Sequence, residues 1–237
     1  MTLFGEMYSR GLIRTWVRDR PSGWELASGK WSPFYFMFRE VVSHPDLFEY
    51  SVACLTTLVH RQQQLSQIGL LVGVATTGIP LAAGVALRTS IPLAFTRKVA
   101  GVRTLDDLRQ TTSAWGDHAL VEGRLEDGTR YLLVDDVVTG GESKLLAKRQ
   151  VEEEARRRGV QLEYAGTIVV VDRGSPGHEP SAFGVTAHHS FYHETRELLD
   201  FGASNWEIAV IRRYLEDPGA FQATTTRDLL MMALAKE

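Results

Sequence analysis

Two adjacent carboxylates, Asp135 and Asp136, follow the apolar run YLLV, which indicates a buried strand. A Thr-Gly-Gly loop comes next, and a helix is expected from about Ser143. Glycines let backbone N–H groups close around a phosphate, and the N-terminus of the following helix adds a favourable dipole. Thr139 and Ser143 supply hydroxyl donors. Carboxylates accept hydrogen bonds from ribose hydroxyls or hold Mg²⁺ through water, because hard cations prefer oxygen ligands. The segment predicts a sugar-phosphate site.

Other chemically suggestive residues have simpler explanations. A bare Asp-Asp pair would more often be a helix cap or a solvated turn, so the prediction depends on the complete strand, loop and helix. His188 and His189 are adjacent in an expected strand, so they should point to opposite faces and not share a metal. Cys54, the single cysteine, fits the apolar pattern around it and is expected to be a small buried hydrophobe.

The elements that position these residues alternate between strands and helices from residue 69 onward. Strands are expected at 69–74, 92–97, 131–136, 163–172 and 184–190, and helices at 79–88 and 143–158. Residues 99–118 are polar, lack a clear period and predict a long loop, with room for one helical turn near Leu105. A loop of this length inside a compact domain is usually functional or mobile. This alternation predicts a parallel sheet covered on both faces, with ligands at the carboxyl ends of its strands.

The two ends of the chain have different patterns. Residues 6–20 predict an amphipathic helix, and the aromatic-rich residues 24–41 predict a hairpin or two short strands. A helix is expected from Ser43 to about Gln63. The tail, residues 203–237, predicts two amphipathic helices separated by Pro218-Gly219.

Bulk properties limit the possible functions. The chain has 237 residues, enough for one sizeable domain or one domain with small additions. Its net charge of -3 gives no bulk electrostatic case for binding nucleic acid or a membrane surface. We recognise neither a signal peptide nor an apolar stretch long enough to span a bilayer. One cysteine allows no internal disulfide, and a cytoplasmic location is expected.

The segment YLLVDDVVTGGES resembles the motif with which type I phosphoribosyltransferases bind 5-phosphoribosyl-1-pyrophosphate (PRPP). Further segments resemble the orotate enzymes of that family, in family order from about residue 5 to 200. They are LASGKWSPFYF and REVVSHPDL (the N-terminal "hood"), GVATTGIPLA (the pyrophosphate loop), Arg97-Lys98, LVEG at 120–123, and VVVDR ending at Arg173. The last 35 or so residues lie outside the resemblance.

The resemblance implies an α/β fold with a central, mostly parallel, twisted sheet flanked by helices, an N-terminal hood and a C-terminal helical extension. We therefore expect a phosphoribosyltransferase domain over 1–202, with the hood at about 1–43, and a helical extension over 203–237. It also implies transfer of phosphoribose from PRPP to orotate or a related acidic acceptor, with Mg²⁺. A homodimer is expected, since in the family a mobile loop reaches the neighbouring active site.

Residue roles follow from the resemblance. Expected catalytic residues are Asp135, Asp136, Arg97, Lys98 and Arg103, the two aspartates also serving Mg²⁺. Expected PRPP-binding residues are Thr76, Thr77, Gly78, Thr139, Gly140, Gly141, Glu142 and Ser143. Expected acceptor-binding residues are Phe34, Tyr35 and Arg173. One of the two aromatics could be a core residue, because strand side chains alternate. Arg97-Lys98 could be a solvated edge, and Asp172-Arg173 a local ion pair.

Three departures from the family pattern keep a second function open. Ala27 and Thr77 stand where the family often has lysine, and the segment 99–118 contains no lysine. Arg103 could supply the missing cation, although its fork differs from an ammonium. Glu142 would repel phosphate if it pointed inward. The alternative to an enzyme is therefore a PRPP- or nucleotide-binding regulatory protein that has lost transferase chemistry.

Overall fold

The computed structural model describes residues 2–26, 29–65, 67–99, 101–102, 107, 119–174 and 184–234. The chain forms two compact units. The larger unit contains Phe48–Asp172 and Glu179–His188, and the smaller contains Met1–Leu47, Arg173–His178 and His189–Glu237. Among the described residues, no helix is long and apolar enough to cross a membrane.

A six-stranded sheet forms the centre of the larger unit, with strand order β10-β9-β8-β5-β6-β7. The strands are β5 (Leu70–Gly73), β6 (Leu93–Thr96), β7 (Val121–Glu122), β8 (Thr129–Val138), β9 (Leu162–Asp172) and β10 (Val185–Ser190). Strand β5 pairs in parallel with β6 and β8, and β8 pairs in parallel with β9, whereas β7 is antiparallel to β6. The expected mostly parallel sheet is confirmed.

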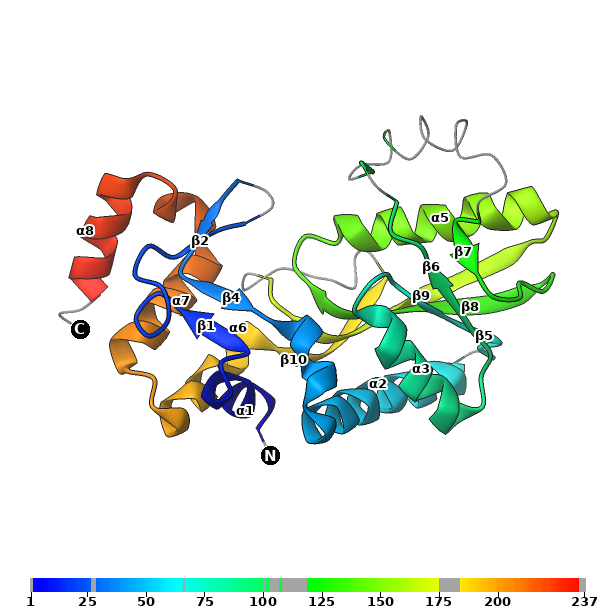
Figure 1. Cartoon of the computed structure of the whole chain (residues 1–237), viewed down its shortest axis with the longest axis horizontal. Coiled ribbons are helices and arrows are strands. Elements are labelled where there is room, and N and C mark those ends of the chain that lie inside the picture. The colour runs from blue at the N-terminus through cyan, green and yellow to red at the C-terminus, as the bar shows by residue number, and fades with distance from the viewer. Residues whose placement is uncertain are drawn as a thin grey trace. The chain divides into compact units, whose positions relative to one another are not determined.

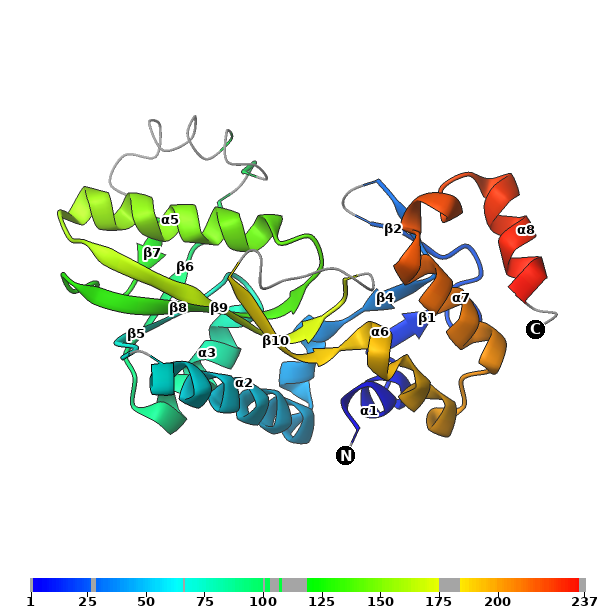
Figure 2. The same ribbon diagram turned by 180° about the vertical axis from the view of Figure 1, so that it is seen from behind.

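Helices cover both faces of this sheet, as a parallel sheet requires. Figures 1 and 2 show α5 (Glu142–Arg158) on one face and α2 (Pro45–Leu65) and α3 (Gly78–Thr89) on the other. Side chains of β5 and of the middle of β8 are buried, Leu71, Val72, Leu132 and Leu133 each being 0% exposed. These continuous apolar runs explain why the strands could be recognised in the sequence.

The smaller unit combines the N-terminal hood with the C-terminal helices. Its elements are α1 (Leu3–Ser9), β1 (Ile13–Thr15), β2 (Trp24–Glu25), β3 (Trp31–Ser32), β4 (Phe34–Phe36), η1 (Phe38–Ser43), α6 (Phe191–Glu194), η3 (Thr195–Phe201), α7 (Asn205–Glu216), η4 (Pro218–Phe221) and α8 (Thr224–Leu234). Antiparallel pairs join β2 to β3 and β1 to β4. The hairpin expected within 24–41 and both tail helices are confirmed.

The helix expected over 6–20 is wrong beyond Ser9. Gly11 has a φ of +72°, a left-handed conformation that glycine adopts without steric cost and that ends the helical path. Ile13 and Thr15 then pair with Phe36 and Phe34 across an antiparallel ladder. Their β-branched side chains suit a strand, and burial against aromatic partners outweighs the local helical period.

The C-terminal segment packs on the hood. The side chain of Gln222 accepts a hydrogen bond from the Trp31 backbone N–H at 2.8 Å and donates to the Trp31 carbonyl at 3.3 Å. The rings of Trp31 and Phe221 are stacked, with centroids 6.2 Å apart. Gln222 thus satisfies backbone groups along the edge of the short β2–β3 ribbon, which otherwise would need water. The boundary expected after residue 202 stays a prediction.

Candidate active site

The two predicted carboxylates lie near the carboxyl end of β8, in the middle of the sheet. Asp135 is 6% exposed, and its Oδ1 accepts the backbone N–H of Asp136 at 2.9 Å. Its Oδ2 lies 2.8 Å from Nζ of Lys144. Asp136 is less deeply buried and its Oδ1 accepts the Val137 N–H at 2.7 Å. Both acids are where the sequence placed them, but their surroundings differ.

Burial and the neighbouring Asp135 carboxylate raise the pKa of Asp136 from 3.8 to about 7, against the opposing influence of Lys144. A carboxyl group that keeps its proton near neutral pH can donate as well as accept hydrogen bonds. A nearby cation would favour the ionised form of the same carboxyl group, because positive charge stabilises the carboxylate. Asp136 is therefore suited to meeting either a hydroxyl group or a cation.

The predicted phosphate loop, residues 139–143, joins β8 to α5. Gly141 precedes the helix with a φ of +87°, so the loop's sharp turn depends on glycine. Thr139 and Ser143 are exposed. The Glu142 carboxylate lies over Gly140, where its oxygens would be only 2.4 and 2.7 Å from an added Cβ. Glu142 is exposed, so this carboxylate has room to turn away when an anion binds.

The predicted pyrophosphate loop, Thr76–Gly78, lies beside the end of β8. It follows β5 and leads into α3, and its Ala75–Thr76 peptide bond is cis. The Ala75 N–H donates to Oγ1 of Thr96 at 2.9 Å, which ties the loop to the end of β6. A Cβ on Gly78 would lie 2.3 Å from the Val134 carbonyl oxygen and 3.1 Å from Oδ1 of Asp135. This close approach places the predicted pyrophosphate loop against the part of β8 that carries Asp135.

We therefore expect Gly78→Ala to displace the loop. Val134 belongs to the central strand and cannot move aside, so the added methyl group should lower the free energy of unfolding by about 1–3 kcal/mol. It should also weaken PRPP binding. Urea unfolding and calorimetric PRPP titration measure the two effects. Gly84→Ala is the matched control, because the three atoms nearest to its added Cβ all belong to the side chain of Val52 and not to backbone. Equal losses of PRPP affinity in both variants would contradict this role of Gly78.

The basic pair Arg97 and Lys98 follows β6, and both side chains are exposed. Nη1 of Arg97 lies 3.2 Å from Oε1 of Glu122. Because β5, β6 and β8 run parallel, the pair and the two loops share one edge of the sheet. Arg103 lies outside the described residues, as do Ala27, Arg109 and His118.

Helix α5 holds the chain on both sides of the predicted 99–118 loop. Nε2 of Gln150 donates to the Arg97 carbonyl at 3.0 Å, and Oε2 of Glu154 accepts the Leu120 N–H at 2.7 Å. Oε1 of Glu154 also lies 2.7 Å from Nε of Arg158, and Nη2 of the same arginine donates to the Val121 carbonyl at 2.5 Å. Glu154 is 4% exposed.

Glu154→Ala should lower the free energy of unfolding by about 2–4 kcal/mol, because it leaves a buried N–H without its acceptor and Arg158 without its counter-ion. Glu153→Ala is the matched control on the same helix. Its partner Arg156 is largely exposed, so a loss under about 1 kcal/mol is expected. Urea denaturation of both variants tests this, and similar losses would show that the Glu154 network contributes little.

The predicted acceptor residues lie in the smaller unit. The Arg173 guanidinium carbon lies 5.3 Å from the ring centroid of Phe34 and 5.9 Å from that of Phe36. Burial lowers the pKa of Arg173, and the phenol groups of Tyr214 and Tyr35 act in the opposite direction. Among the described residues of the smaller unit, no carboxylate forms an ion pair with it. A local pair with Asp172 stays a prediction.

Tyr35 lies on the other face of β4 from Phe34. Phe34 is 0% exposed and Phe36 is 9% exposed, whereas Tyr35 stacks on Trp24 with centroids 6.3 Å apart. The alternation of side chains along the strand produces this arrangement. Phe34 is thus the core aromatic beside Arg173, and the role of Tyr35 toward an acceptor stays a prediction.

No protein-family model matches the chain. It is 31% identical over 209 residues to an orotate phosphoribosyltransferase of Dinoroseobacter shibae, covering 86% of this chain and 84% of that protein. The chain belongs to the orotate phosphoribosyltransferase family. Similar solved structures include the Aeropyrum pernix orotate phosphoribosyltransferase (26% identity, 85% of this chain and 100% of that one, TM-score 0.61). They also include Leishmania donovani UMP synthase (22% identity, 90% of this chain, TM-score 0.67), of which this chain spans 41%.

Membership of the orotate phosphoribosyltransferase family confirms the resemblance, the fold class and the assignment to the phosphoribosyltransferases. The comparisons leave the roles of individual residues as predictions. Sequence reasoning missed Lys144, Gln150 and Glu154. A signal was present for Lys144, because it shares its helix face with the buried residues Ala147 and Val151, where an apolar side chain is expected.

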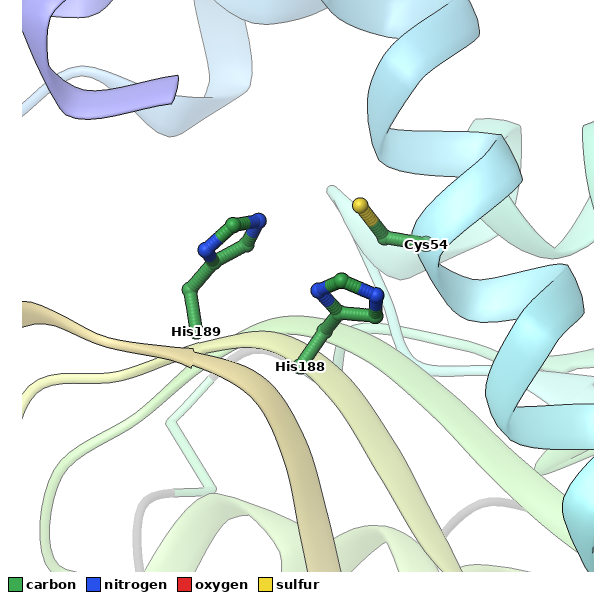
Figure 3. Close-up of side chains that lie close together, drawn as sticks. All are labelled: Cys54, His188 and His189. Carbon is green, nitrogen blue, oxygen red and sulfur yellow. The ribbon is translucent and has the colours of Figure 1, made fainter. Parts of the chain in front are cut away.

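The histidine pair does not follow the expected alternation. Figure 3 shows the rings of His188 and His189 on the same side of β10. Ligand atoms of Cys54 and His188, both in the larger unit, lie within 4.8 Å of one another. In the smaller unit, Nδ1 of His189 lies 2.7 Å from Oε2 of Glu194, and its ring packs against Phe4. Cys54 is 4% exposed, as expected of a buried hydrophobe.

Proposed function

We propose that this protein transfers phosphoribose from PRPP to orotate, or to a related acidic pyrimidine-like acceptor, with release of pyrophosphate and dependence on Mg²⁺. The observation that carries the proposal is the contact of the predicted pyrophosphate loop with the carboxyl half of β8 in the larger unit. Gly78 of the predicted pyrophosphate loop approaches Val134 and Asp135, and the predicted phosphate loop, residues 139–143, begins one residue after β8.

In the proposed reaction, a ring nitrogen of the acceptor forms a bond to the anomeric carbon of PRPP as the bond to pyrophosphate breaks. The electron pair of that bond leaves with pyrophosphate, so positive charge develops on the ribose. The protein's task is to position the reactants and to provide complementary charge. Hydroxyl groups of Thr139 and Ser143, with backbone N–H groups of their loop, would hold the 5-phosphate. Asp136 would accept from the ribose hydroxyls.

We expect Mg²⁺ to be held by the carboxylate of Asp136 and not by both aspartates. Magnesium prefers oxygen ligands and retains several waters. Asp136 is partly exposed and can offer a carboxylate oxygen, whereas both oxygens of Asp135 are engaged by Lys144 and by a backbone N–H. When bound, Mg²⁺ would neutralise charge on the departing pyrophosphate. Arg97 and Lys98 are suited to the same task from the end of β6.

Arg173 supports an anionic or carbonyl-bearing acceptor. The Arg173 guanidinium is half-buried and has no carboxylate partner among the described residues of the smaller unit, and a planar carboxylate matches its fork. The guanidinium also makes a cation–π contact with the ring of Phe34. We also expect a homodimer in solution, in keeping with the family, and sedimentation as a monomer at assay concentrations would contradict that expectation.

The alternative is a protein that binds PRPP without turnover. It gains support from the absence of lysine in the sequence 99–118. A half-buried arginine suited to an acceptor carboxylate has no role in such a protein, which favours the transferase. Pyrophosphate release with and without orotate, beside a PRPP titration, separates the two: the enzyme binds PRPP and releases pyrophosphate only with acceptor, whereas the regulator binds and releases none.

A further inference from the structure

Lys144 is a buried cation directly behind the predicted phosphate loop. Its side chain is 7% exposed, and Nζ lies 2.8 Å from Oδ2 of Asp135. It also donates to the Val137 carbonyl at 2.5 Å and to Oγ of Ser143 at 3.2 Å. An ammonium group carries three hydrogens, so these three acceptors account for all of its donors.

A lysine at this position is electrostatically costly. Burial of an ammonium group is unfavourable unless it is paired, and a cation in the first turn opposes the helix dipole. The next buried positions on this face of α5 are Ala147 and Val151. An apolar side chain at 144 would continue that face without the cost. The presence of a lysine in place of an apolar residue therefore indicates a role at the site, and the three acceptors of its ammonium group show what that role is.

The first consequence of Lys144 is a division of labour between the carboxylates. Lys144 occupies Oδ2 of Asp135, while the Asp136 N–H occupies Oδ1 and Gly78 closes over that side. Asp135 is thus directed into the protein. Asp136 is partly exposed, and among the described residues it has no ion-pair partner. Asp136 is left as the carboxylate that faces a ligand.

The second consequence concerns Ser143, whose side chain is exposed in the phosphate loop. Lys144 donates to the Ser143 oxygen, so the hydroxyl hydrogen must point away from the ammonium group. The hydroxyl is thereby prepared as a donor, which is what a phosphate oxygen requires. One cation thus orders the end of β8 and the start of α5 together.

We propose that Lys144 is a positioning residue for PRPP: it retains Asp135 as an internal counter-ion, leaves Asp136 to meet the ribose, and orients the Ser143 hydroxyl toward the 5-phosphate. This inference rests on the proposed function. It predicts a defect specific to PRPP, because none of the partners of Lys144 belongs to the predicted acceptor residues.

The test compares Lys144→Met with Lys148→Met in the full chain. Lys148 is on the same helix but is 33% exposed and lies over the ring of Tyr164. Lys144→Met should raise the Kd and KM for PRPP at least tenfold and leave the KM for orotate unchanged within about twofold, by analogy with other buried charge partners. Lys148→Met should match the wild type. Calorimetry with PRPP and Mg²⁺ gives the Kd independently of turnover.

A double variant, Lys144→Met with Asp135→Asn, separates positioning from mere stability. It removes the buried unpaired carboxylate, so its Tm should recover toward that of the wild type while its PRPP affinity stays weak. Recovery of PRPP affinity together with Tm would overturn the proposal, as would wild-type affinity in the single variant. Failure of the proposed function has a different signature, since the wild type itself would then neither bind PRPP nor release pyrophosphate.

Discussion

Asp136→Asn is expected to lower kcat/KM for PRPP roughly 100- to 1000-fold, equivalent to about 3–4 kcal/mol of transition-state stabilisation. The amide keeps the size of the side chain but loses the negative charge that would meet the ribose and Mg²⁺. The matched control is Asp127→Asn, on the exposed loop before β8, where the side chain accepts the Gln161 N–H. Steady-state pyrophosphate release measures both. Less than a threefold loss at Asp136 would show that its charge is not used.

The same substitution should stabilise the protein without ligands above neutral pH. Asp136 has a pKa of about 7 when folded against 3.8 ordinarily. Below pH 3.8 both states are protonated and the group has no effect. Between the two values the unfolded state loses its proton first, so folding stability falls as pH rises. The difference of about three between the two pKa values corresponds to at most about 4 kcal/mol in the free energy of unfolding. Because Asp136 is only partly buried, we expect Asn to add about 1–2 kcal/mol at pH 8 and little at pH 4.

Urea unfolding at pH 4 and pH 8, without PRPP or magnesium, tests this gain. Asp127→Asn serves again as the control and should show no such pH dependence. A stability difference that is equal at the two pH values would contradict a raised pKa at Asp136. Loss of activity combined with gained stability would indicate that the charge is retained for chemistry and not for folding.

Arg173→Met is expected to raise the KM for the acceptor about 100-fold, with a much smaller effect on the Kd for PRPP. The methionine retains apolar contact with Phe34 but removes the planar pair of donors, and charged hydrogen bonds of this kind contribute about 1.5–3 kcal/mol. Initial rates at varied orotate, beside a PRPP titration, separate the two effects.

Arg212→Met is the matched control for Arg173→Met. Arg212 also lies over an aromatic ring of the smaller unit, with its guanidinium carbon 4.3 Å from the centroid of Tyr192. It should leave the acceptor KM within about twofold of the wild type. An equal rise of the acceptor KM in both variants would mean that the effect is not specific to Arg173. An unchanged acceptor KM in Arg173→Met would show that Arg173 does not bind the acceptor.

The larger unit was predictable because its signals are local. Buried parallel strands such as β5 and β8 are continuous apolar runs, and glycine marks both ends of α5, at Gly141 and Gly159. The carboxylates at the end of β8 and their glycine loop followed from the same pattern. Their place at the carboxyl edge of the sheet followed from parallel pairing alone.

What the sequence did not predict depends on contacts between distant segments. The N-terminal helix ends early because Ile13 finds Phe36 in a strand more than twenty residues away. Gly78 is needed because its loop meets the backbone of Val134, which only the folded sheet brings near. The partner of Lys144 is Asp135, nine residues earlier, and a strand, a loop and a helix turn must form before the two meet.

Release of pyrophosphate from purified protein with PRPP, Mg²⁺ and orotate tests the central claim most directly. The account predicts release that requires the acceptor, that is lost when magnesium is chelated, and that is strongly reduced in Asp136→Asn. PRPP binding without release under these conditions would contradict transfer to orotate, and the absence of both binding and release would contradict the PRPP site itself.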